Sequence, residues 1–142
     1  MEKLALGKKY SLGDKTLSEE EIIDFAKAYD PLDFHTDKEV AEKSIFNGLV
    51  ASGSHLFHWF YKEKWIPLFG YSVLAGLQLN NWKFLLPVYA NQKITATVSI
   101  ASIKASAKRD ASIVEWHFVF SDKDDNLVQS LELYILHKNN NK

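Results

Sequence analysis

The chain has 142 residues, of which 46% are hydrophobic and 25% are charged, and it contains no cysteine. This length and composition predict one globular domain over residues 1–142, because disordered chains have fewer aromatic residues and more net charge. The lack of cysteine excludes a disulfide scaffold, a thiolate nucleophile and a zinc site built on cysteine. The formal net charge of −1 predicts no binding of nucleic acid.

Neither a secretory signal nor a membrane anchor is expected from the apolar segments. Lys8 and Lys9 interrupt the N-terminal residues before an apolar run can form. No segment approaches the roughly 18 consecutive apolar residues that a membrane-spanning helix needs. We therefore expect a cytoplasmic protein without a membrane partner. The polar tail, 139–142, has no apolar side chain to bury and is expected to fray.

Helices are predicted in the first half of the chain. Ser18 and Glu21 have the spacing of a capping box, so a helix is expected to begin there and to end before Pro31. A short second helix is expected to begin at Thr36, which has a glutamate three residues later. The third helix, from about 53 to 65, is apolar on nearly all sides and should be covered by other elements.

Strands are predicted in the second half of the chain. The segments rich in β-branched and aromatic residues lie near 73–80, 82–90, 92–105, 112–122 and 127–138. Within them apolar and polar residues alternate, as in strands with one buried face. Helices that precede a run of strands predict an α+β fold, here an antiparallel sheet around the single buried helix.

The segment between the first two predicted helices contains a candidate acid–base pair. Asp30 and His35 are close enough in sequence to contact one water molecule. A histidine accepts a proton near neutral pH, and a carboxylate can orient the water or share the proton. The alternative is structural, because an aspartate before a proline commonly forms a turn.

A second candidate element precedes the buried helix, at 47–53. A glycine near a helix start allows a ligand to approach the backbone, and free amides there favour a developing oxyanion. Gly53 has this position and Ser52 precedes it. The alternative is that Gly53 only permits close packing of the helix start.

Together these two elements resemble the signature of the MaoC-like hydratases and dehydratases. The resemblance extends from about Tyr10 to the last strand. It is strongest over 25–37 (FAKAYDPLDFHTD) and 46–53 (FNGLVASG), and a third part is 82–88 (WKFLLPV). The resemblance implies a hot-dog fold, in which an antiparallel sheet wraps a long central helix. It also implies a homodimer or higher oligomer with active sites at the subunit interface.

The resemblance further implies the chemistry. Asp30 and His35 would be the catalytic residues, and Gly53, with Ser52 beside it, would bind the substrate carbonyl. The implied reaction is reversible hydration of a 2-enoyl thioester of coenzyme A or acyl carrier protein. The thioester is the substrate, and the reaction needs no metal and no further cofactor.

Two other functions are compatible with the sequence. Leu32 and Ser52 differ from the commonest pattern of the family, which keeps open a non-catalytic acyl-binding subunit. A thioesterase is disfavoured, because such proteins generally place a carboxylate on the central helix and 54–61 has none. His55 and His58 on that helix lack an evident third metal ligand and are expected to be packed or hydrogen-bonded.

Overall fold

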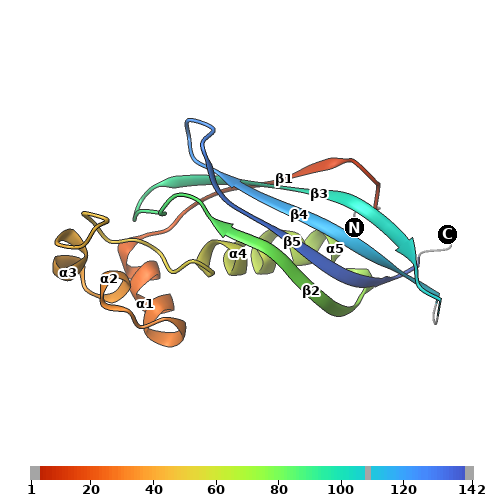
Figure 1. The fold of residues 1–142 in the computed structure, drawn as a ribbon, viewed down its shortest axis with the longest axis horizontal. Coiled ribbons are helices and arrows are strands. Elements are labelled where there is room, and N and C mark those ends of the chain that lie inside the picture. The colour runs from red at the N-terminus through yellow and green to blue at the C-terminus, as the bar shows by residue number, and fades with distance from the viewer. Residues whose placement is uncertain (1–3, 108–109, 140–142) are drawn as a thin grey trace.

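The computed structural model describes residues 4–107 and 110–139, and its strands form one antiparallel sheet (Figure 1). The strands are β1 (Lys9–Thr16), β2 (Val73–Phe84), β3 (Lys93–Ala105), β4 (Ala111–Ser121) and β5 (Leu127–Lys138). Their order in the sheet is β1-β3-β4-β5-β2, so that β1 and β2 are the edges. The pairing of β1 with β3 is interrupted by a bulge between Ser11 and Gly13.

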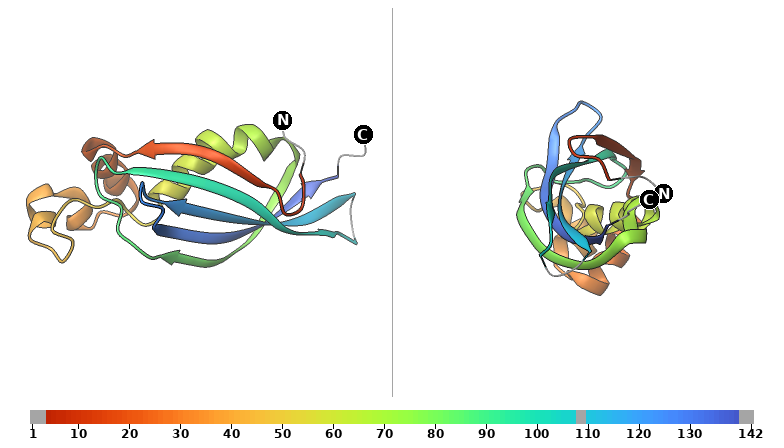
Figure 2. Two further views of the ribbon diagram at one scale, coloured as in Figure 1. Left: turned by 90° about the horizontal axis from the view of Figure 1, so that it is seen from above. Right: turned by 90° about the vertical axis from the view of Figure 1, so that its right-hand side faces the viewer.

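A helix of several segments lies along the concave face of the sheet, which curves around it in the end view of Figure 2. The segments are α4 (His55–Phe60), the π-helical turn η1 (Tyr61–Trp65), α5 (Ile66–Phe69) and the 3-10 turn η2 (Gly70–Ser72). The predicted α+β arrangement is confirmed. The helix begins two residues later than expected and continues through Pro67, which lies in the first turn of α5. A proline is tolerated there because that turn does not need its missing amide hydrogen.

Aromatic side chains fill the space between helix and sheet. Trp116 on β4 and Trp65 on the helix are fully buried and meet edge to face, with ring centroids 5.1 Å apart. Phe60 and Phe120, also fully buried, contact each other with tilted rings whose centroids are 5.6 Å apart. The alternation of buried residues along β4 agrees with the prediction of a strand with one buried face.

The core between helix and sheet also contains a buried histidine, His137. His137 on β5 accepts a hydrogen bond at Nε2 from the indole nitrogen of Trp116, at 3.0 Å. Its proton must therefore be on Nδ1, which donates to Ser72 Oγ at 2.9 Å. Burial lowers the pKa of His137 to about 4, so the imidazole is neutral at physiological pH.

Three short helices lie beyond one end of the sheet (Figure 1). They are α1 (Glu19–Tyr29), α2 (Asp33–Thr36) and α3 (Lys38–Glu42). The predicted capping box is confirmed, because Ser18 and Glu21 exchange hydrogen bonds of 3.1 Å. The predicted start of the second helix at Thr36 is wrong. Asp37 caps α3 instead, and its carboxylate accepts bonds from the amides of residues 39 and 40.

The strand predictions need two corrections. β1 was not predicted, and the segments expected at 73–80 and 82–90 form one strand that ends at Phe84. Fraying of the tail at 139–142 stays a prediction: Asn139 is the last described residue of the tail, and its backbone amide donates to the Asp110 carbonyl at 3.0 Å. Residues 140–142 lie outside the described residues. Within 4–107 and 110–139, no helix has the length and apolarity needed to span a membrane.

Candidate active site

A short pairing positions the chain that enters α4. Val50 forms an isolated antiparallel bridge with Tyr89, and the Ala51 amide donates to the Val88 carbonyl at 2.8 Å. These contacts hold 49–51 beside 88–90, the segment that follows β2. The backbone just before α4 is thereby fixed beside the segment that leads from β2 to β3.

His35 is the best-defined side chain at this position. It lies in α2 rather than in a loop, and only 6% of its surface is exposed. Its Nδ1 lies 2.7 Å from the Val50 carbonyl oxygen. A carbonyl can only accept, so Nδ1 carries a proton, and whenever the imidazole is neutral Nε2 has a free lone pair.

Asp30 faces that lone pair. It is the C-cap residue of α1, and its Oδ2 lies 3.4 Å from His35 Nε2. Nε2 and the carboxylate are then both acceptors, and the separation exceeds an ordinary hydrogen bond. A donor placed between them, such as one water molecule, can bond to both groups. The predicted pair therefore comes together in space, with Asp30 partly exposed and His35 buried.

A pocket of about 360 Å³ opens beside His35. It is lined by His35, Phe46, Val50, Ala51, Gly53, Phe84, Leu85, Leu86, Pro87, Val88 and Gln129. Two of these residues have polar side chains, His35 and Gln129, and the other described lining residues are apolar or glycine. Such a wall suits an apolar ligand that presents a few polar groups at fixed points.

Gly53 lines the pocket in the turn just before α4. Its φ is not positive, so no left-handed backbone requires a glycine there. A Cβ atom on Gly53 would lie 2.8 Å from Cζ of Phe84, closer than real contacts allow. Among the hydrogen bonds of the described residues, none has the Gly53 amide as donor. That amide is available to a ligand that enters beside the Phe84 ring.

The other predicted residues near this turn are arranged differently. Ser52 is 2% exposed, its hydroxyl has no hydrogen-bond partner among the described residues, and it is outside the pocket lining. His55 is packed as expected, stacked on Phe25 with centroids 4.1 Å apart, and burial lowers its pKa to about 4. His58 is exposed.

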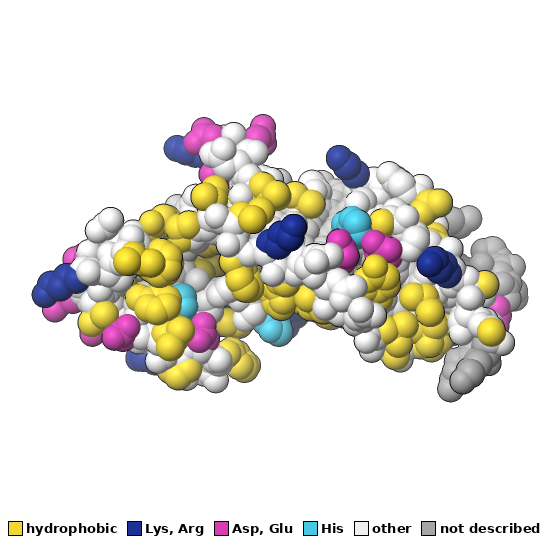
Figure 3. Space-filling view, in the orientation of Figure 1, with side chains coloured by type: hydrophobic (Ala, Val, Ile, Leu, Met, Phe, Trp, Pro, Cys, Tyr) yellow, Lys and Arg dark blue, Asp and Glu magenta, His cyan; other side chains and the backbone are white. Residues whose placement is uncertain are grey.

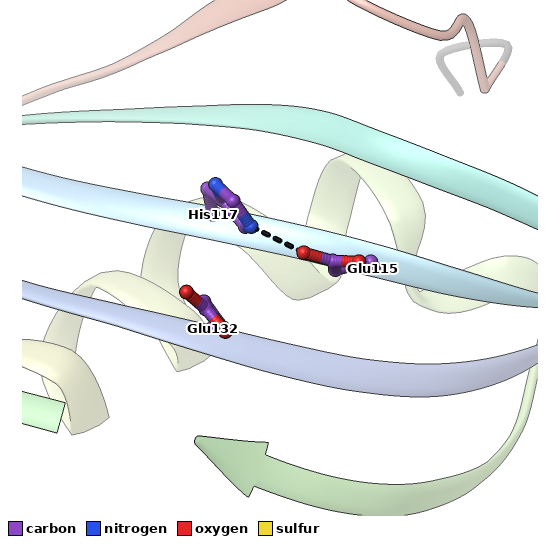
Figure 4. A group of neighbouring side chains, drawn as sticks. All are labelled: Glu115, His117 and Glu132. Carbon is purple, nitrogen blue, oxygen red and sulfur yellow. Dashed lines mark hydrogen bonds and ion pairs between the residues drawn. The ribbon is translucent and has the colours of Figure 1, made fainter. Parts of the chain in front are cut away.

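A separate polar cluster lies on the opposite face of the sheet. Ligand atoms of Glu115, His117 and Glu132 all lie within 4.8 Å of one another, a spacing that a metal ion could bridge (Figure 4). A histidine beside two acidic side chains is visible on that face in Figure 3. His117 donates to Glu115 at 2.6 Å, which lowers the pKa of Glu115, and Asn81 donates to Glu132 at 3.1 Å. The cluster thus satisfies its own hydrogen bonds and is on the side away from His35.

Sequence reasoning did not identify two residues of the pocket. Phe84 belongs to the segment compared with the family, but nothing in the sequence places its ring over Gly53. Gln129 is a single glutamine in a strand, without a motif around it. The feature that marks Gln129 as a site residue is its burial beside the pocket. This burial can be recognised only when the pairing of β5 with β2 is known.

Comparison with known proteins gives one family match and one curated relative. The family described as MaoC like domain matches residues 3–116. The uncharacterized protein YdeM of Bacillus subtilis is 29% identical over 102 residues, which cover 70% of this chain and 72% of YdeM.

Solved structures show the same fold at low sequence identity. A MaoC-like dehydratase from Rhodospirillum rubrum superposes with a TM-score of 0.85 at 22% identity, over 98% of this chain and 96% of that one. An (R)-hydratase from A. caviae involved in PHA biosynthesis gives a TM-score of 0.76 at 20% identity, over 98% and 100% of the two chains. These likenesses confirm the hot-dog fold.

Proposed function

The chain belongs to the MaoC-like domain family, and from this premise we propose that it is an acyl-thioester hydratase or dehydratase. The observation that carries the proposal is the position of His35 Nε2, which lies 3.4 Å from the Asp30 carboxylate beside a pocket that Gly53 also lines. The solved (R)-hydratase and dehydratase with this fold support the same class of reaction.

In the proposed reaction Asp30 and His35 hold one water between them. His35 Nε2 takes a proton from the water as its oxygen forms a bond to C3 of a 2-enoyl thioester. The Nδ1 bond to the Val50 carbonyl keeps the imidazole in the tautomer that can accept this proton. The electron pair of the double bond moves toward C2 and the thioester carbonyl.

The carbonyl oxygen then becomes an enolate oxygen, which needs a hydrogen-bond donor. The Gly53 amide is the donor we assign to it, because this amide is unused within the described residues and lies in the pocket wall. The proton taken from water is returned to C2, which completes addition of water across the double bond. Dehydration follows the same steps in reverse.

The test is an activity screen with crotonyl-coenzyme A and longer 2-enoyl thioesters. Hydration consumes the conjugated enoyl absorbance and adds the mass of one water to the thioester. Release of free coenzyme A without hydration would instead indicate a thioesterase. Binding of thioesters with no turnover would indicate the non-catalytic acyl-binding subunit.

We also propose a two-fold homodimer in which β2 packs against its copy. Edge strand β2 exposes Leu74, Leu77 and Leu79, each by more than a third of its surface. The exposed Phe84 and Leu85 continue this row into the pocket lining. An exposed apolar edge favours pairing with another chain, so a copy at β2 would also cover the mouth of the pocket.

A further inference from the structure

Gln129 is a polar group in the pocket that the proposed reaction does not use. It lies on β5 opposite Phe84 of β2, and 3% of its surface is exposed. Its side-chain oxygen Oε1 is buried without a hydrogen-bond partner among the described residues. The residue nevertheless lines the same pocket as His35.

A buried carboxamide oxygen without a partner is costly, because it has lost its hydrogen bonds to water. Native structures contain few such groups, and each calls for a reason. The outer-face cluster of Glu115, His117 and Glu132 differs on this point, because its groups bond to one another and to neighbours. Ser52 Oγ is also unpartnered, but Ser52 does not line the pocket. Gln129 therefore combines an unmet hydrogen bond with a place in the pocket wall.

The surroundings of Gln129 indicate which part of the ligand it meets. The same pocket is also lined by Phe46, Leu86 and Val88, which suit a hydrocarbon chain. The volume of about 360 Å³ is near the lower end for ligand sites, so it suits an acyl group and not a whole carrier. A carboxamide offers an acceptor at one end and donors at the other. A hydroxyl both donates and accepts, so it satisfies either orientation of the amide.

We propose that Gln129 is a specificity-determining residue that selects acyl chains with a hydroxyl group beyond the reacting carbons C2 and C3. The inference rests on the proposed function, which supplies the thioester and places its carbonyl near Gly53. An unsubstituted alkyl chain would leave the carboxamide unpaired in an apolar wall. A hydroxylated chain would complete its hydrogen bonding.

The experiment compares saturated acyl-coenzyme A thioesters of equal length, with and without a terminal hydroxyl, by calorimetric titration. Saturated chains cannot be hydrated, so binding is measured separately from catalysis. Wild-type protein should bind the hydroxylated thioester about 10-fold more tightly. Gln129→Leu should abolish or reverse the preference and raise Tm by a few degrees, because the unpaired amide is gone. Ser130→Ala, which alters the neighbour on the opposite face, is the matched control and should keep the preference.

The outcomes separate the two proposals. Equal affinity of wild-type protein for both thioesters, while crotonyl-coenzyme A is hydrated, would overturn the role of Gln129 alone. A preference for the hydroxylated chain without hydration of any enoyl thioester would overturn the proposed reaction alone. Failure to bind any thioester would overturn both. If Gln129→Leu does not fold, Gln129→Met replaces it, and a preference retained in that variant would overturn the inference.

Discussion

Replacing Gly53 by alanine tests whether the turn before α4 binds the substrate carbonyl. The new Cβ would lie 2.8, 2.9 and 3.2 Å from three ring atoms of Phe84, well inside the 3.4 Å at which ordinary contact begins. Phe84 is 57% exposed in the single chain, so its ring can rotate outward without disturbing the core of that chain. The cost of this movement is partly offset because alanine has fewer unfolded conformations than glycine. We expect the free energy of unfolding to change by no more than about 1 kcal/mol.

The effect on activity should be much larger than the effect on stability. The methyl group and the displaced ring occupy the space through which a carbonyl would reach the Gly53 amide. Loss of one oxyanion donor typically costs about 100-fold or more in rate, and a partial obstruction should cost roughly 10- to 100-fold in kcat/KM. The assay is hydration of an enoyl thioester alongside urea unfolding of the same preparation.

Phe84→Ala provides the control for the ring. In the double variant Gly53→Ala/Phe84→Ala the clash is removed and the added methyl group remains. If the methyl group itself blocks the carbonyl, the double variant stays impaired relative to Phe84→Ala. Full activity of Gly53→Ala would refute the carbonyl site. A loss of more than about 2 kcal/mol of stability would instead assign Gly53 a packing role.

Three further predictions concern the catalytic pair, the assembly and acid stability. Asp30→Ala and His35→Ala should each lower turnover by roughly 100-fold with the fold intact. The double variant should be little worse than either single variant, because the two residues act as one unit. Additive losses from two mild single variants would contradict this. Light scattering should show a dimer at micromolar concentration, which Leu77→Lys on β2 should dissociate; a wild-type monomer would refute the interface. The pKa of His137 is about 4 in the folded state and near 6.5 when unfolded, so the unfolded state binds the proton first as pH falls. Stability should therefore decline between about pH 6.5 and pH 4, with about 3 kcal/mol due to this residue, and His137→Gln should flatten that decline in urea titrations. An unchanged slope in that variant would contradict the assignment.

Local signals in the sequence predicted local structure well. Ser18 and Glu21 form their capping box because both partners are three residues apart and need no other element. The prediction that the second helix begins at Thr36 was wrong because Asp37, one residue later, is an equally good cap. A separate turn of helix, α2, precedes Asp37. β1 was missed because its two buried residues, Tyr10 and Leu12, alternate over too few positions to stand out.

The candidate site was predictable only in the part that lies within one segment. Asp30 and His35 are five residues apart, and their approach depends on one turn between α1 and α2. The contacts of Gly53 with Phe84 and the burial of Gln129 depend on how β2 pairs with β5 and how both lie over α4. Such long-range contacts have no periodicity along the chain that a sequence pattern could show.

The two edges of the sheet differ in a way that would limit growth of the proposed dimer. β1 exposes the charged residues Lys9 and Asp14, whereas β2 exposes the apolar side chains of Leu74, Leu77 and Leu79. A further chain is therefore discouraged at that edge, where it would have to bury charge. The proposed association through β2 would use the same patch on both copies and leave none for a third. Chains joined in this way close on themselves and cannot extend strand by strand into fibres.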